Sequence, residues 1–278
     1  MRINTNIAAM NTYSRLTAAN TAKTNSLAKL SSGSRINKAG DDAAGLAISE
    51  KMKSQIGGLT QAKRNAQDGI SLVQTAEGAL NESHSILERM RDLAVQGAND
   101  TLTSDDRGSI NKELTALHEE LTRIASTTEY NTKKLLNKDG NAFTFQIGAN
   151  ENQTLTVTIG AMDGKTLLVS DKDTFKINSV ATNVRMANGM ISKIDKAIAT
   201  VSSQRAALGA VQNRLEHTIN NLTATNENLS DANSRIRDVD MAEEMMTFTK
   251  SNILSQAATS MLAQANAMPN SVLNLLQG

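Results

Sequence analysis

Residues 184–236 read VRMANGMISKIDKAIATVSSQRAALGAVQNRLEHTINNLTATNENLSDANSRI, and apolar side chains recur through them at alternating steps of three and four. Twelve of the sixteen positions on this repeat are apolar, which is typical of a coiled-coil seam and narrower than the apolar stripe of a globular-surface helix. At 1.5 Å per residue, such a helix would be about 80 Å long. We therefore predict a long helix whose main chemistry is packing against other helices.

Other heptads lie on both sides of the middle of the chain. One runs from Ile48 to Ala94, and a shorter one follows Thr103 and Asp106, which have the spacing of a helix capping box. The large side chains expected to pack between the long helices of this rod are Leu59, Val73, Leu80, Leu87, Ile194, Val201, Leu208, Leu215 and Leu222. The predicted fold class is mainly α, an elongated bundle of long coiled-coil-like helices.

Four polar residues interrupt the repeat of residues 184–236, namely Arg205, Gln212, Asn226 and Asn233. A buried polar residue at a seam position can fix the register between two helices. Alternatively, the seam faces solvent at these points. We favour the first interpretation.

The middle of the chain has a different period. Apolar residues alternate with polar ones from Phe143 to Ile147 and again from Leu155 to Ile159, with a turn-like segment between them. This pattern predicts a small β-hairpin within a β region of about residues 140–178. A further short strand is expected at residues 167–169 or 175–177.

Composition argues against several classes of function. The formal net charge of +1 gives no electrostatic reason to expect nucleic acid or an anionic membrane as a partner, and the chain has no cysteine. Gly160 to Thr166 has three residues between its glycines, where a phosphate-binding P-loop has four. His118 lacks the second histidine of a zinc-protease motif. We predict no enzyme activity, no cofactor and no metal site.

Both ends of the chain carry weak amphipathic patterns. The apolar positions expected to serve self-assembly are Ile3, Ile7, Met10, Leu254, Ala258, Met261, Ala265, Met268, Val272 and Leu275. One such seam against one partner buries too little apolar surface to offset the entropy lost on ordering the helix. We therefore expect both ends to become helical only in an assembly, with a kink or a stop at Pro269.

Several stretches also resemble a known family. They include MRINTNIAAMNTYSRL at the start, KLSSGSRINKAGDDAAGLAISEKMKSQI from Lys29, SSQRAALGAVQNRLEHTINNL from Ser202 and SNILSQAATSMLAQAN from Ser251. In these residues the chain is similar to bacterial flagellin, the filament subunit of the flagellum. A hook–filament junction protein and a monomeric coiled-coil binding module are the alternatives that we keep open.

The resemblance implies an organisation into two parts. Residues 1–45 and 235–278 would hold the terminal helices that pair in an inner filament layer, and residues 46–234 would form a long-helix rod domain that includes the β-hairpin. Little sequence remains for an outer domain. The resemblance also implies export of the unfolded chain without a cleaved signal peptide, polymerisation at the tip of an extracellular filament, an export chaperone and a filament cap.

One binding patch also follows from the resemblance. Flagellins that are recognised by the flagellin-sensing Toll-like receptor share a motif that LERMRDLAVQ matches here, from Leu87 to Gln96. The receptor contacts would be Arg89, Leu93 and Glu113. The alternative is that these side chains are simply the solvated face of a packed helix.

Overall fold

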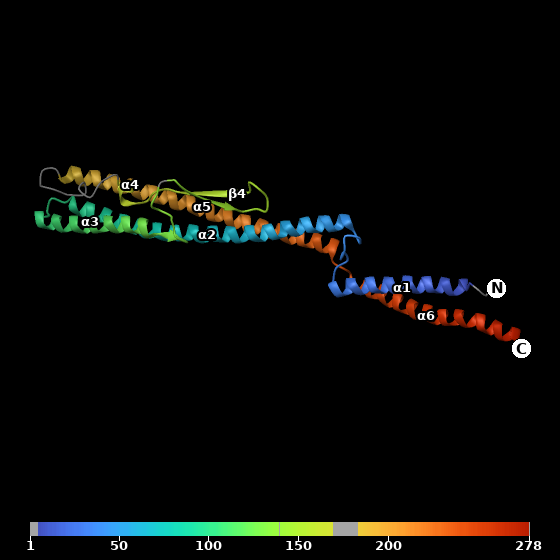
Figure 1. Cartoon of the computed structure of the whole chain (residues 1–278). Coiled ribbons are helices and arrows are strands. Elements are labelled where there is room, and N and C mark those ends of the chain that lie inside the picture. Colours follow the sequence, from blue (N-terminus) through green and yellow to red (C-terminus); the bar gives the residue numbers. More distant parts are fainter. Residues whose placement is uncertain (1–4, 139, 169–182, 278) are drawn as a thin grey trace. The chain divides into compact units, whose positions relative to one another are not determined.

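The computed structural model describes residues 5–138, 140–168 and 183–277, and the side chains of these ranges except 168, 183–188 and 269–277. The fold is mainly α with a small β-hairpin, as predicted (Figure 1). The helices are α1 (Ile7–Ser32), α2 (Ala43–Gly97), α3 (Ser104–Thr127), α4 (Gly164–Leu168), α5 (Asn183–Arg237) and α6 (Met241–Gln277). The strands are β1 (Glu129–Tyr130), β2 (Lys133–Lys134), β3 (Asn141–Gln146) and β4 (Thr154–Ile159).

The chain divides into two compact units. The terminal unit comprises Met1–Ile56 and Glu227–Gly278, and the central unit comprises Gly57–Asn226. The domain boundaries expected from the sequence fall after residue 45 and before residue 235. The long helices α2 and α5 each contribute residues to both units.

The core of the central unit lies between α2, α3 and α5. The largest group of buried side chains in contact includes Leu80 and Leu87 of α2, Leu114 of α3, and Ile194 and Val201 of α5. All the side chains expected to pack in the rod are buried, including Leu59, Val73, Leu208, Leu215 and Leu222. Three heptad-patterned helices therefore bury their seams against one another within this unit.

The β-hairpin packs on this helical core. Strands β3 and β4 are antiparallel, with Phe143 opposite Val157 and Phe145 opposite Leu155. Along β4 the buried residues Leu155, Val157 and Ile159 alternate with exposed threonines, as expected for a strand with one face on a core. The side chain of Gln204 on α5 donates to the carbonyl oxygen of Thr158 at 3.2 Å.

Two details around the hairpin differ from the sequence analysis. The short antiparallel pair β1–β2 was not expected. The strand expected at residues 167–169 is also not observed as far as residue 168. Residues 167 and 168 belong to the helix α4, in which the N–H of Leu167 donates to the carbonyl of Asp163 at 3.0 Å. One helical turn is enough to place Leu167 in the core. Residue 169 and residues 175–177 lie outside the described residues.

Polar residues on the seam of α5 make specific bonds to α2. The Asn226 amide donates to the hydroxyl of Thr60 at 2.9 Å, and the hydroxyl of Ser49 donates to the amide oxygen of Asn233 at 2.8 Å. A hydrogen bond between two side chains forms at only one alignment of the helices. These contacts support the register interpretation for Asn226 and Asn233, whereas the Gln212 amide donates to the Glu216 carboxylate within α5 at 3.1 Å.

The expected capping box begins α3. The N–H of Asp106 donates to the Thr103 hydroxyl oxygen at 3.3 Å, and the N–H of Thr103 donates to the Asp106 carboxylate at 3.0 Å. Hydrogen bonds from the hydroxyl and the N–H of Thr103 hold the pKa of Asp106 below its usual range. The carboxylate interaction therefore stabilises the folded chain above about pH 4 and is lost as the pH falls through the lowered pKa.

We expect Thr103→Ala to lower the free energy of unfolding by about 1 kcal/mol, because it removes the acceptor for the first turn of α3. Urea denaturation of the dilute chain, followed by circular dichroism, measures the change. Thr101→Ala, in the exposed turn before α3, is the control and should have little effect. Equal losses for the two variants would contradict the capping role.

We expect Leu87→Ala to destabilise the chain by about 2–5 kcal/mol, because a fully buried side chain leaves a cavity among three helices. Val95→Ala removes an exposed side chain from the same helix and should change stability by less than about 0.5 kcal/mol. The same denaturation experiment compares them. A small loss for Leu87→Ala would contradict a closely packed core.

Candidate self-assembly surface

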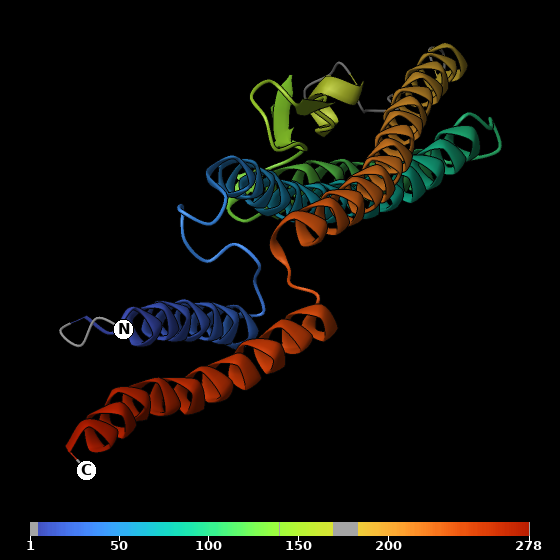
Figure 2. The same ribbon diagram turned by 90° about the vertical axis from the view of Figure 1, so that its right-hand side faces the viewer.

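In the terminal unit, α1 and α6 pair side by side in antiparallel directions (Figure 2). The amide of Asn6 donates to the carbonyl oxygen of Ala265 at 2.7 Å. Further along, the Ser255 hydroxyl donates to the amide oxygen of Asn20 at 2.7 Å, and the Lys23 ammonium donates to that of Asn252 at 2.9 Å. As residue numbers rise along α1, those of its partners fall along α6.

Small and polar residues dominate the contact between these two helices. The buried and half-buried positions of α6 that recur at steps of three and four are Glu244, Phe248, Ser251, Ser255, Ala258, Leu262 and Ala265. On α1 the corresponding positions include Asn6, Ala9, Thr12, Leu16, Ala19, Lys23 and Ser26. Few large apolar side chains lie on either face, so the pair buries little apolar surface within one subunit.

The face of α6 that contacts α1 overlaps only in part with the heptad expected to serve self-assembly. Ala258 and Ala265 face the pair, but Leu254 is 51% exposed, Met261 is 61% exposed and Met268 is also exposed. The contact face runs through Ser251, Ser255, Ala258, Leu262 and Ala265, so it shares only Ala258 and Ala265 with the expected heptad. Ile3 lies outside the described residues, as do the side chains of Val272 and Leu275.

The large apolar side chains excluded from this seam are exposed on the terminal unit. Among the described residues, twelve of the thirteen exposed large hydrophobic side chains belong to it: Ile7, Met10, Tyr13, Leu27, Ile48, Met241, Met245, Met246, Ile253, Leu254, Met261 and Met268. The thirteenth is Val95 of the central unit. A concentration of exposed apolar side chains of this kind indicates an interaction surface.

Part of this surface was not predicted from the sequence. Tyr13, Leu27, Met241, Met245 and Met246 are exposed apolar residues that it did not assign to assembly. The sequence nevertheless contains a pattern that indicates them, because large apolar residues lie off the heptad positions of both terminal segments. Apolar residues both on and off the heptad positions indicate a helix with more than one contact face.

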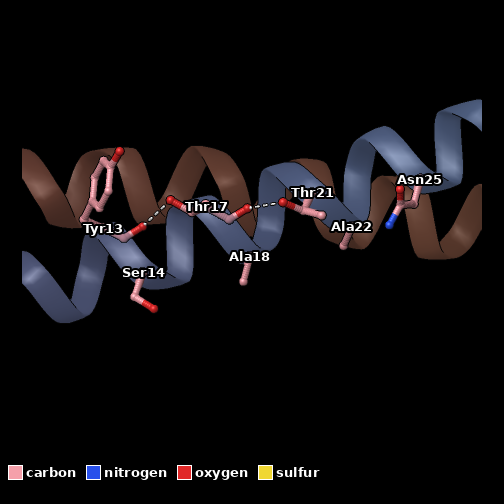
Figure 3. A pocket seen from close by; sticks show the side chains of 7 residues that line it. All are labelled: Tyr13, Ser14, Thr17, Ala18, Thr21, Ala22 and Asn25. Atoms are coloured by element: carbon pink, nitrogen blue, oxygen red, sulfur yellow. Dashed lines mark hydrogen bonds between the residues drawn. The ribbon is translucent and has the colours of Figure 1, made fainter.

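A shallow concave face of α1 adds to the surface (Figure 3). Tyr13, Ser14, Thr17, Ala18, Thr21, Ala22 and Asn25 line it. The hydroxyls of Thr17 and Thr21 donate to the carbonyls of Tyr13 and Thr17 at 3.0 and 2.9 Å, respectively. Their hydrogen-bonding needs are therefore met within the helix. The small side chains along this face leave room for another helix to approach α1 closely.

The segment between α1 and α2 contacts the segment between α5 and α6, next to the end of the helix pair. Gly33, with φ of +68°, ends α1 in the left-handed conformation, and Ser34 forms an antiparallel bridge with Asp238. The Arg35 guanidinium donates to the Ile236 carbonyl at 2.6 and 3.2 Å from Nη2 and Nε. Arg35 therefore caps the carboxyl end of α5, where a cation is favourable.

The candidate receptor residues lie in the central unit. The guanidinium of Arg89 on α2 donates to the Glu113 carboxylate on α3 at 2.7 and 2.9 Å, and both side chains are exposed. Leu93 is only 2% exposed and belongs to the core. The structure thus brings Arg89 and Glu113 together at the surface and places Leu93 beneath it.

In the described part of the chain, no cluster of three or more His, Cys, Asp or Glu residues could hold a metal ion. No helix of that part is both long enough and apolar enough to cross a membrane.

Comparison with known proteins identifies the family. The family descriptions "Bacterial flagellin N-terminal helical region" and "Bacterial flagellin C-terminal helical region" match residues 3–141 and 191–276. Flagellins of Bacillus subtilis strain 168 and Halalkalibacterium halodurans are 52% and 51% identical, each over 100% of both chains. The flagellar filament 31.3 kDa core protein of Treponema maltophilum is 45% identical, also over 100% of both chains.

These matches favour the filament subunit over the junction protein and the monomeric module. The chain therefore belongs to the bacterial flagellin family and is a structural subunit of the extracellular flagellar filament.

Proposed function

We propose that α1 and α6 are the surfaces through which this subunit polymerises, each burying its exposed apolar side chains against other copies of the chain. The observation that carries the proposal is the composition of the two faces of α6. Small and polar residues such as Ser251 and Ser255 face α1, whereas Met246, Ile253 and Met261 are exposed. The larger apolar area is thus available to neighbours in the filament.

The energetics couple folding of the terminal pair to assembly. Burial of one Leu, Ile or Met side chain contributes about 1.5–3 kcal/mol, and seven such residues are exposed in one subunit within residues 241–268 of α6, where side chains are described. Without neighbours, the α1–α6 pair lacks this contribution while still losing conformational entropy. Our expectation remains that the terminal segments are largely disordered in the free chain and become helical in the filament.

The same surface accounts for the other partners that we propose. A chain exported unfolded through the flagellar type III apparatus would expose the methionine-rich α6 segment in the cytoplasm. An export chaperone that covers this segment would prevent premature association. At the filament tip, a capping protein would hold the incoming chain while its terminal segments fold against earlier subunits.

We expect Ile253→Glu to raise the concentration of free subunit in equilibrium with filaments by at least tenfold. Ile253 is 59% exposed in one subunit, so the change should leave the central unit folded, but an unpaired carboxylate buried between subunits costs at least about 1.4 kcal/mol, or tenfold. Seeded polymerisation followed by sedimentation and electron microscopy measures it.

The matched control is Asn81→Glu, which places the same charge at an exposed position of α2 in the central unit. Its polymerisation should stay close to that of the parent chain. Normal filaments from Ile253→Glu, at the parent concentration, would contradict the proposed surface. Circular dichroism of each free chain verifies that the central helices remain folded.

A second candidate function is recognition by the host flagellin-sensing Toll-like receptor. It is supported by the resemblance of LERMRDLAVQ to the motif of recognised flagellins and by the exposed ion pair between Arg89 and Glu113. We propose that these two side chains contact the receptor. Leu93, being buried, would act by supporting the helix surface beneath them.

We expect Arg89→Ala to reduce the potency of the monomer in a receptor reporter-cell assay by at least tenfold, since a central arginine contact contributes at least about 1.4 kcal/mol. Arg91→Ala is the control, because Arg91 lies on the same helix and forms a similarly exposed ion pair with Asp195 at 2.7 Å. Equal potency of parent and Arg89→Ala would exclude the patch.

A further inference from the structure

Proline removes the α-helical hydrogen-bond donor for one carbonyl group in α6. In an α-helix, each carbonyl accepts a hydrogen bond from the N–H four residues later. The residue four after Ala265 is Pro269, which has no N–H, and α6 nevertheless continues through it to Gln277. Of the kink or stop expected at Pro269, the stop therefore does not occur. Ala265 is only 5% exposed, so leaving its carbonyl unpaired would be unfavourable.

The missing donor comes from the other terminal helix. Nδ2 of Asn6 donates to the Ala265 carbonyl oxygen at 2.7 Å. Oδ1 of the same side chain accepts the Ala9 N–H at 3.0 Å and caps the amino end of α1. One amide therefore begins α1 and also completes the hydrogen bonding of α6.

We propose that Asn6 and Pro269 together form a register lock for the terminal helix pair. Small seam residues such as Ala258 and Ser255 specify the alignment of two helices weakly, because neighbouring turns offer similar surfaces. The Ala265 carbonyl is different from the other carbonyls of the described α6 seam. Its α-helical donor would be the N–H of residue 269, and that residue is proline. A shift by one turn would move Asn6 to a satisfied carbonyl and leave that of Ala265 unpaired.

The lock deepens the proposed function and rests on it, since α1 and α6 are expected to fold together only in the filament. An alignment fixed at this point also determines which apolar side chains of the pair, such as Met10 and Met261, face neighbouring subunits. Asn6 and Pro269 are thus positioning residues for the self-assembly surface.

The test is a double-mutant cycle on the full chain, with the free-subunit concentration at equilibrium with filaments as readout. Asn6→Asp keeps the capping oxygen and removes the N–H donor. It should raise this concentration about fivefold, which corresponds to about 1 kcal/mol for one hydrogen bond. With Pro269→Ala, residue 269 supplies the missing N–H, so Asn6→Asp should then raise it less than twofold. Asn6→Ser, an uncharged capping residue, should behave in the same way as Asn6→Asp.

The matched control is Asn20→Ala, which breaks the bond from Ser255 in the same helix pair. Its effect should be the same with proline or alanine at position 269. An Asn6 effect that is equally large in both backgrounds overturns the register lock while leaving polymerisation intact. Failure of the parent chain to polymerise would instead contradict the proposed function.

A spectroscopic measurement keeps the proposal testable if Pro269→Ala does not assemble. In solid-state NMR of filaments, the ¹³C carbonyl resonance of Ala265 reports whether its oxygen accepts a hydrogen bond. It should shift in Asn6→Asp filaments relative to the parent and remain in place in Asn20→Ala filaments. An unchanged resonance in Asn6→Asp filaments overturns the proposal.

Discussion

The structure of the terminal unit depends on which side chains α1 and α6 use to contact each other. Their shared seam consists mostly of small and polar residues, such as Ala9, Ser26, Ser251 and Ala265. This choice brings the two helices close together but buries little apolar surface. The large apolar residues of both helices are left exposed. We propose that these exposed residues gain their hydrophobic stabilisation by contact with other copies of the chain.

In the central unit, by contrast, the large apolar residues lie at the contacts between helices. There the heptads of α2, α3 and α5 bury their large residues, including Leu87, Leu114 and Ile194, in one core. The hairpin adds Val157 and Ile159 to that core. This unit is therefore equipped to be stable in a free chain, whereas the terminal pair is suited to form with neighbours. The difference fits our proposal that the chain is exported before it polymerises.

Polar contacts provide the specificity that apolar packing does not. Asn226 and Asn233 bond from α5 to α2, Arg35 caps the end of α5, and Asn6 reaches the carbonyl of Ala265. Each of these bonds contributes modestly to stability, on the order of 1 kcal/mol. Because each of these bonds depends on how the joined segments are aligned, we infer that they favour one register among several of similar apolar burial.

The sequence alone determined the family, the long helices and the main β-hairpin, but not the β1–β2 pair or α4. Periods of 3.5 and 2 follow from helix and strand geometry, so the long helices, the capping box at Thr103 and the hairpin at residues 141–159 could be predicted from local pattern. Tertiary structure decided which face of each terminal helix meets its partner. Leu254 and Met261 lie on a heptad that looks like a seam, yet Ser251, Ser255 and Leu262 lie at the contact. A helix with apolar residues on more than one face has several seams available, and only the geometry of its neighbour selects one. The bond from Asn6 to Ala265 joins residues at opposite ends of the chain, so no local pattern could have revealed it.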